Sequence, residues 1–244
     1  MTPYISILIP AYNISQNHNP SQIENVKEYL KQQKYSFEVI FIDDGSSDDT
    51  PKILSKFVKG DSRFKIITAP HTGKCGAISN GVKAATGKFI LFTDFDQSTP
   101  LYELEKFIPV LENDADLVIA NRIRNKQKDS LMSYLRSKLF NSFVRIIALP
   151  SIPDTQCGFK AFRNEVGKII FNSLVVCKPK HITGPYMGAF DVEFIVIALK
   201  KGYKIVSVPV AWNREVSKNL KFSEPLKMIA EVVKIKMYYS FSKP

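Results

Sequence analysis

Short apolar runs recur along the first half of the chain, and a more polar segment follows each of them. The runs cover residues 4–9, 37–42, 64–67, 89–93 and 116–120. Runs of this length that are rich in β-branched and aromatic residues predict buried strands. The segments 20–32, 49–58, 74–85 and 100–111 have the periodicity of helices. This alternation predicts an α/β protein whose parallel sheet is covered by helices on both faces.

The pattern changes after residue 121. A polar, basic loop leads into the amphipathic stretch 131–149 and then into the segment DTQCGFKAF. A helix over 189–201 and a strand over 204–208 follow, and residues 220–241 read as a basic, amphipathic C-terminal helix. No Pro/Gly/Ser-rich linker interrupts the chain. We therefore predict one domain, residues 1–244, with a first half at 1–120 and a second half at 121–244.

The charge balance implies an anionic partner. Lys and Arg outnumber Asp and Glu by 34 to 23, a surplus of 11, which suits nucleic acid, phosphorylated substrates or an acidic lipid surface. The three cysteines are far apart and the histidines are scattered, which argues against a zinc site and a disulfide framework. The first residues show neither a signal peptide nor a membrane anchor. We therefore expect a reducing, cytoplasmic setting.

Two carboxylates stand one residue apart where a predicted strand ends, in the text FILFTDFDQSTP. Alternate side chains of an extended segment point the same way, so Asp94 and Asp96 can reach one divalent cation. Open α/β sheets bind ligands at this end of their strands. The alternative is a simple turn that caps the next helix, for which Pro100 would suit the first position.

Three other polar loops follow predicted segments of the same sheet. In the first loop a nucleobase could stack on Tyr12 and form a hydrogen bond with an amide. In the second loop carboxylates could accept hydrogen bonds from ring N–H groups or ribose hydroxyls. In the third loop a lysine could neutralise phosphate. The alternative for the first loop is an ordinary loop without a ligand, and the alternative for the second is a capped turn. The glycines near Lys74 fit neither a dinucleotide-binding nor a P-loop pattern. The side chains concerned are Pro10, Tyr12 and Asn13, then Asp43 and Asp44, then Lys74.

In this order, PAYN, DDGSSDDT, GKCGAISNG and DFD resemble the family-2 inverting glycosyltransferases. VIANR, DTQCGFKAF, GAFDVEFI and VPVAWNREVSKN are similar to the polyprenyl-phosphate branch of that family, notably the dolichyl-phosphate glucosyltransferases. The resemblance covers nearly the whole chain. It implies the GT-A nucleotide-diphosphosugar transferase fold, in which helices flank a mostly parallel sheet.

The resemblance also implies roles for individual residues. The nucleotide sugar would contact Pro10, Tyr12, Asn13, Asp43, Asp44, Lys74 and Asp94, and a divalent cation, Mg²⁺ or Mn²⁺, would bind Asp94 and Asp96. Catalysis would involve Asp96, Arg122, Asp191 and Lys218, and the acceptor would meet Arg136, Gln156 and Glu193. For Asp191 and Glu193 a structural pair at a helix start is the alternative, and for Lys218 a solvated charge.

The implied reaction moves a hexose, glucose from UDP-glucose, to polyprenyl or dolichyl phosphate at the cytoplasmic membrane face. The first half would bind the nucleotide sugar and the second half the acceptor, and basic segments would hold the protein on an anionic membrane surface without spanning it. Alternatives are GDP-mannose as donor, a saccharide hydroxyl as acceptor with Asp191 as base, or a non-catalytic basic adaptor. Basic and aromatic residues do not cluster as in nucleic-acid-reading motifs, so no nucleic acid is expected.

Overall fold

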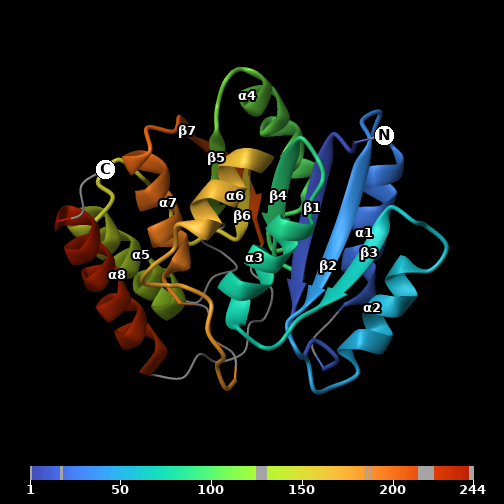
Figure 1. Ribbon diagram of the computed structural model, residues 1–244, viewed down its shortest axis with the longest axis horizontal. Coiled ribbons are helices and arrows are strands. Elements are labelled where there is room, and N and C mark those ends of the chain that lie inside the picture. The colour runs from blue at the N-terminus through green and yellow to red at the C-terminus, as the bar shows by residue number, and fades with distance from the viewer. Residues whose placement is uncertain are drawn as a thin grey trace.

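The computed structural model describes residues 2–16, 19–124, 131–184, 186, 188–213 and 223–241. These residues contain a seven-stranded sheet with the order β3-β2-β1-β4-β6-β5-β7 (Figure 1). Every neighbouring pair is parallel except the two that involve β6. The mostly parallel α/β prediction is therefore confirmed. The strands are β1 (Ile5–Ala11), β2 (Phe37–Asp43), β3 (Phe64–Thr68), β4 (Phe89–Thr93), β5 (Leu117–Arg124), β6 (Phe159–Arg163) and β7 (Ile205–Trp212).

The central strands are buried on both faces, which explains why they read as continuous apolar runs. Alternate residues of β1 enter different cores: Ile7 and Ile9 belong to one cluster and Leu8 to the other. In the register of the sheet, Ile7 lies between Val39 of β2 and Leu91 of β4. These side chains are all fully buried. Their burial fixes the register, because a slip by one residue would turn each side chain to the opposite face.

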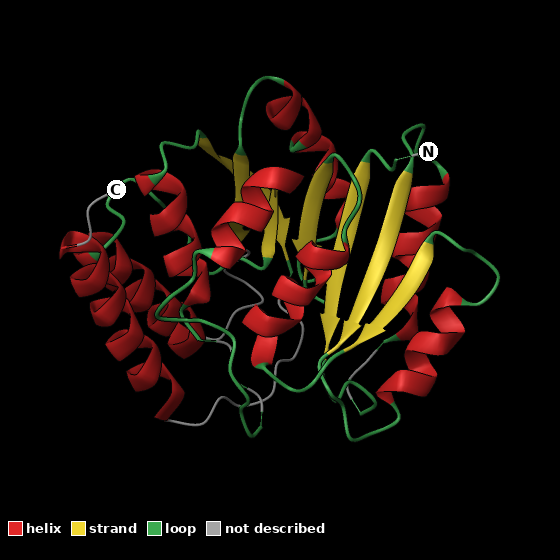
Figure 2. Cartoon of the chain, viewed as in Figure 1, coloured by secondary structure: helices red, strands yellow, loops and turns green. Residues whose placement is uncertain are grey.

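Helices cover both faces, as the alternating pattern predicts. One face packs against α1 (Pro20–Lys31), α2 (Thr50–Val58), the 3₁₀ helix η1 (Leu101–Lys106) and α4 (Ile108–Glu112). The other packs against α3 (Gly73–Ala84), α5 (Leu131–Ile147), α6 (Asn164–Asn172), α7 (Phe190–Lys200) and α8 (Ser223–Phe241). In Figure 2, α3 and α6 lie in front of the sheet. Of the helices described, none is at once long and apolar enough to cross a bilayer.

The structure differs from the sequence-based prediction in several places, and β5 runs on to Arg124 instead of ending near residue 120. The single helix expected over 100–111 is a 3₁₀ helix followed by α4, and Pro109 in the first turn of α4 cannot donate the N–H that would join them. The last strand runs on to Trp212. The segment DTQCGFKAF, for which no element was expected, contains the start of β6, and α6 follows directly.

β6 brings the second half of the chain against the first. It runs antiparallel to β4, and Phe159 pairs with Thr93. The residues just before β6 therefore lie beside those just after β4. This pairing sets the second half's DTQCGFKAF segment next to the acidic pair.

Candidate functional site

The carboxyl ends of β1, β2 and β4 meet at one edge of the sheet, at the bottom of Figure 1. The polar loops picked out from the sequence follow these strands. The beginning of α3 comes to the same edge, because the side chain of Lys74 reaches Asp94. Parallel strands end together, so loops far apart in sequence are brought into one crevice.

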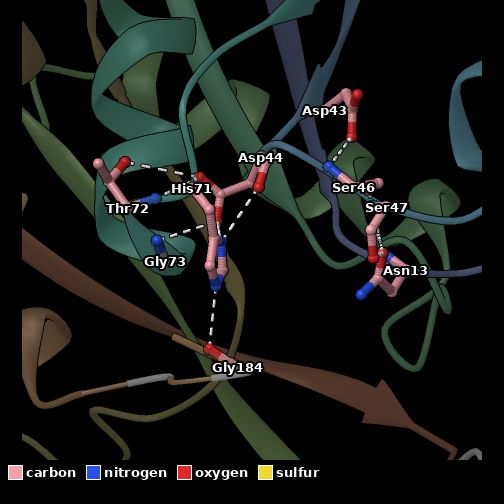
Figure 3. Close-up of polar contacts among 9 residues, drawn as sticks. All are labelled: Asn13, Asp43, Asp44, Ser46, Ser47, His71, Thr72, Gly73 and Gly184. Atoms are coloured by element: carbon pink, nitrogen blue, oxygen red, sulfur yellow. Dashed lines mark hydrogen bonds and ion pairs between the residues drawn. The ribbon is translucent and has the colours of Figure 1, made fainter. Parts of the chain in front are cut away.

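The loops after β1 and β2 are tied to each other (Figure 3). Asn13, with a positive φ of 48°, accepts a hydrogen bond from the N–H of Ser47 at 2.9 Å. The N–H of Asn13 donates to the hydroxyl of Ser46 at 3.0 Å. Asp43 is buried, and its carboxylate accepts from the N–H of Ser46 at 3.1 Å. These bonds fix the backbone of both loops and hold Asp43 at the edge.

Asp44 fastens the loop that leads into α3 (Figure 3). Its carboxylate accepts from the N–H groups of Thr72 and Gly73, both at 2.9 Å, and lies 2.7 Å from Nδ1 of His71. Burial raises the pKa of Asp44, although these partners oppose the shift. Gly45 next to it has a φ of +68°, and a Cβ there would meet the backbone N of His71 at 2.8 Å. The turn therefore requires glycine.

His71 joins three parts of the site. Its ring stacks on Tyr12, with centroids 3.9 Å apart and planes within 2°. Its Nε2 lies 2.9 Å from the carbonyl oxygen of Gly184, in the second half of the chain. One face of the Tyr12 ring is thus covered by His71. Tyr12, two residues after Pro10, is half-buried. The pair forms an aromatic platform at the end of β1.

The acidic pair lies directly after β4. Oδ1 of Asp94 is 2.5 Å from Nζ of Lys74, and Oδ1 of Asp96 accepts from the N–H of Ser98 at 2.9 Å. Burial, and then the neighbouring charge of Asp94, raise the pKa of Asp96. A Cβ on Gly158 would overlap the Asp94 carboxylate. Glycine before β6 therefore makes room for this side chain.

The acidic pair could hold a divalent cation, because a positive ion would offset the repulsion between two neighbouring carboxylates. Among the described residues, no three His, Cys, Asp or Glu side chains gather as a complete metal site. Mg²⁺ is commonly bound by one or two carboxylates together with substrate phosphates. In such a site Asp94 and Asp96 would supply the two carboxylates, and a diphosphate would supply further oxygens.

Arg122 is held in a bidentate ion pair. Its Nε and Nη2 donate to the carboxylate of Asp154 at 2.5 and 2.8 Å, and its guanidinium lies 5.4 Å from the ring centre of Trp212. Burial lowers the pKa of Arg122, but the charge and hydrogen bonds of Asp154 and the charge of Asp94 together outweigh it, and the net shift is upward. The same arginine opposes the effect of burial on Asp154, whose pKa is lowered. The fork geometry fixes the guanidinium at the end of β5.

The two acidic residues expected on the acceptor side are both engaged within the protein. Asp191, at the start of α7, lies 2.5 Å from Nζ of the fully buried Lys160. Glu193 accepts from Tyr239 of α8 at 2.8 Å and from three successive backbone N–H groups of residues 175–177. The geometry gives Glu193 a clear structural task, since it fastens this loop and α8 to the core.

Of three further expected residues, the structure describes Gln156 but neither the side chain of Arg136 nor Lys218. Gln156 donates its N–H to Asp154 at 3.1 Å, and its amide donates to the hydroxyl of Thr155 at 3.3 Å. The side chain of Arg136 and the whole of Lys218 are outside the described residues. Their roles therefore stay predictions.

Sequence reasoning missed three residues that build the site: His71, Asp154 and Lys160. His71 stands shortly after β3, as the other loop residues follow their strands, and this position was the available signal. Asp154 opens the DTQCGFKAF segment, two residues before Gln156. For Lys160 no local signal exists, because its partner Asp191 belongs to another element.

This chain is similar to known glycosyltransferases over most of its length. The family model described as glycosyl transferase family 2 matches residues 6–170. Dolichyl-phosphate beta-glucosyltransferase of Dictyostelium discoideum is 32% identical over 97% of this chain and 75% of that protein. The Homo sapiens protein of the same name is 32% identical over 98% of this chain and 76% of its own length. The Saccharomyces cerevisiae protein is 29% identical over 97% and 75%.

Solved structures share the fold at low sequence identity. Mannosyl-3-phosphoglycerate synthase from Rubrobacter xylanophilus superposes with a TM-score of 0.65 at 18% identity, over 97% of this chain and 73% of that one. Glucosyl-3-phosphoglycerate synthase from Mycobacterium tuberculosis, in complex with Mn²⁺, UDP-glucose and phosphoglyceric acid, gives a TM-score of 0.62 at 16% identity, over 96% and 80%. These likenesses bear on the fold alone.

Proposed function

This chain belongs to glycosyl transferase family 2 and has the GT-A fold, and we propose that it transfers glucose from UDP-glucose to polyprenyl or dolichyl phosphate. The observation that carries the proposal is the match, over 97–98% of this chain, to proteins named dolichyl-phosphate beta-glucosyltransferase. The beta linkage in that name is the one that inversion of an α-linked sugar nucleotide would give. The DTQCGFKAF segment and the C-terminal half lie within this match.

The donor would bind at the carboxyl edge of β1, β2 and β4. In this proposal Tyr12 stacks with the base, and Pro10, Asn13, Asp43 and Asp44 shape the nucleoside pocket. Asp94 and Asp96 would hold Mg²⁺ or Mn²⁺, which would neutralise the charge that develops on the departing diphosphate. Lys74 contacts Asp94, and Arg122 is close enough for the Asp94 charge to contribute to its raised pKa, so both positive charges would stabilise the same leaving group.

The chemistry is a single displacement at the anomeric carbon. An oxygen of the acceptor phosphate forms the new bond from the face opposite the diphosphate, and the electrons of the broken C–O bond pass to the nucleoside diphosphate. A phosphate oxygen is already anionic near neutrality, so no side chain has to remove a proton. Asp191 and Glu193 are both engaged by internal partners, which favours such an acceptor over a sugar hydroxyl that needs a base.

The proposal also covers the net charge of the protein and its location in the cell. The net charge of +11 suits an anionic donor, an anionic acceptor and an acidic leaflet. We place the protein at the cytoplasmic face of a membrane, held at its surface. Gln156, Arg136 and Lys218 are proposed to meet the acceptor or the diphosphate, as the family resemblance implies.

Transfer of labelled sugar tests the proposal directly. The purified protein, Mn²⁺ and UDP-[¹⁴C]glucose, mixed with dolichyl phosphate, should give radioactivity that extracts into organic solvent and is released by mild acid. Asp96→Asn should lower the rate by about 100-fold, whereas Asp114→Asn should not, because this exposed carboxylate precedes β5 and lies at the opposite edge of the sheet. GDP-[¹⁴C]mannose and a soluble saccharide acceptor serve as the competing arms. Labelled product in those arms alone would refute the proposed donor or acceptor.

A further inference from the structure

The C-terminal helix α8 has two apolar faces, and one of them has no partner among the described residues. Val232 and Ile235 are fully buried and pack into the core. A second stripe points away from the protein: Leu226, Ile229, Val233, Met237 and Phe241, with exposed fractions of 63, 36, 39, 59 and 87%. Their spacing of three and four residues places them on one side of the helix. A helix that served only the core would be polar on this side.

The inner face of α8 is fastened by specific polar contacts. Glu231 accepts from the hydroxyl of Tyr186 at 2.6 Å and from the N–H of Ala189 at 2.8 Å. Tyr239, two turns further on, donates to Glu193 at 2.8 Å. These bonds fix the rotation of the helix about its axis. The outward direction of the apolar stripe is therefore a property of the folded protein.

Charge is segregated along the same helix. Lys227 and Lys234 flank the stripe on one side and Lys236 on the other, and all three are exposed. Among residues 226–241 the one acidic side chain is Glu231, and it is turned inward. The outward half of α8 therefore combines an apolar stripe with positive charge alone. A second copy of this surface would set lysines against lysines, which disfavours a symmetric dimer.

A small cavity lies where α8 meets α5 and α7. Its volume is about 180 Å³, and its lining includes Leu149, Val196 and Leu199 together with Lys200 and Lys236. Apolar walls with lysines at the same place suit a molecule that has both a hydrocarbon and an anionic part. The cavity thus repeats, at the C-terminal end of α8, the chemistry of the stripe.

We propose that the outward face of α8 lies in the interface of an anionic bilayer, with its apolar stripe among the acyl chains and its lysines at the headgroups. This pattern is typical of helices that bind in the plane of a membrane. The inference deepens the proposed function, because it names the surface on which an enzyme with a lipid acceptor would sit. The test of membrane binding needs neither donor nor acceptor. Membrane binding by α8 can therefore be refuted while glucosyl transfer is confirmed, and glucosyl transfer can be refuted while membrane binding is confirmed.

Vesicle flotation tests the surface. The wild-type protein should float with vesicles of phosphatidylcholine containing about one third phosphatidylserine, less with phosphatidylcholine alone, and less at high salt. Val233→Asp/Met237→Asp should abolish flotation. The matched control Tyr102→Asp/Ile169→Asp, at exposed apolar positions of η1 and α6, should float like the wild type. Circular dichroism of each variant shows whether it is folded.

Charge reversal separates location from net charge. Lys227→Glu/Lys234→Glu should lower the partition coefficient by at least about 25-fold, which is roughly fivefold for each lysine. Lys31→Glu/Lys56→Glu makes the same change in net charge on α1 and α2 and should have a much smaller effect. Equal flotation of wild type and the Val233/Met237 variant would overturn the proposal. So would light scattering that shows a wild-type dimer which this variant converts to monomer.

Discussion

The ammonium of Lys74 lies 2.5 Å from Oδ1 of Asp94, at the edge of the sheet where a cation is proposed to bind. Burial lowers the pKa of this lysine, but the charges of Asp94, Asp191 and Asp96 outweigh it and the net shift is upward. Lys74 therefore stays charged and serves as the counter-ion of the acidic pair. A divalent cation would share Asp94 with it or displace it.

Replacing Lys74 by methionine should show whether the lysine and a divalent cation compete for the acidic pair. Without the ammonium, Asp94 and Asp96 repel each other with less compensation, so Mn²⁺ binding in the absence of nucleotide should tighten by about tenfold. Affinity for UDP should fall, because a cation beside the diphosphate is lost. Electron paramagnetic resonance measures the affinity for Mn²⁺, and calorimetry measures the affinity for UDP. Lys83→Met, an exposed lysine of the same helix, is the control, and unchanged Mn²⁺ affinity in Lys74→Met would contradict the competition.

Gly158→Ala should disable the site while it leaves the fold nearly intact. The new Cβ would overlap the carboxylate of Asp94, which can swing away because it is the end of a side chain. We expect loss of Mn²⁺ binding and of glucosyl transfer, with a stability cost of about 1 kcal/mol. Gly167→Ala is the opposite case, since its Cβ would overlap the ring of buried Phe162. That variant should unfold more readily and still bind Mn²⁺, as thermal unfolding and calorimetry would report.

Lys160→Met should destabilise the protein by about 3–5 kcal/mol, because it leaves Asp191 buried without its partner. Adding Asp191→Asn should recover much of that loss, since the uncompensated charge is then removed. Urea unfolding of the two single variants and the double variant measures the coupling. Additive losses in the double variant would show that the two residues do not act as a pair.

Acid should weaken the protein partly through Glu38, on β2. Burial raises the pKa of Glu38, but Lys65, Ser6 and Thr86 outweigh it and the value falls from 4.5 to about 2. A depressed pKa in the folded state stabilises the fold above pH 4.5, and this contribution is lost as the pH falls toward 2. Glu38→Gln should therefore flatten the decline of unfolding free energy over that range, measured by urea titration at each pH. The control is Glu24→Gln, which removes an exposed carboxylate of α1.

The strands other than β6 and the acidic pair could be predicted because their signals are local. An apolar run such as 89–93 indicates that the strand is buried and where it ends. The order of the elements then predicts which strand ends form the carboxyl edge of the parallel sheet. Asp94 and Asp96 then had to lie at that edge. The local pattern was enough for the position of these side chains.

The partners of the site could not be predicted because each acts across a long separation. His71, Asp154 and Lys160 pair with residues 27 to 32 positions away. β6 was missed for the same reason: Lys160 interrupts its apolar run, and its burial is tolerated only because Asp191 is folded against it. A pattern read along the chain holds no record of such a pairing. Structure was required to show that the acceptor-side acids have internal partners.

The reversed strand β6 has a consequence for how the chain can be divided. β5 follows β4 in sequence, yet its neighbours in the sheet are β6 and β7, so no hydrogen bonds join β4 to β5 directly. A fragment that ends near residue 120 would carry β4 with one side unpaired and part of β5 detached from it. Its complement would hold β6 with nothing on either flank. The two pieces should remain unfolded alone and regain structure when mixed, as obligate halves of one folding unit.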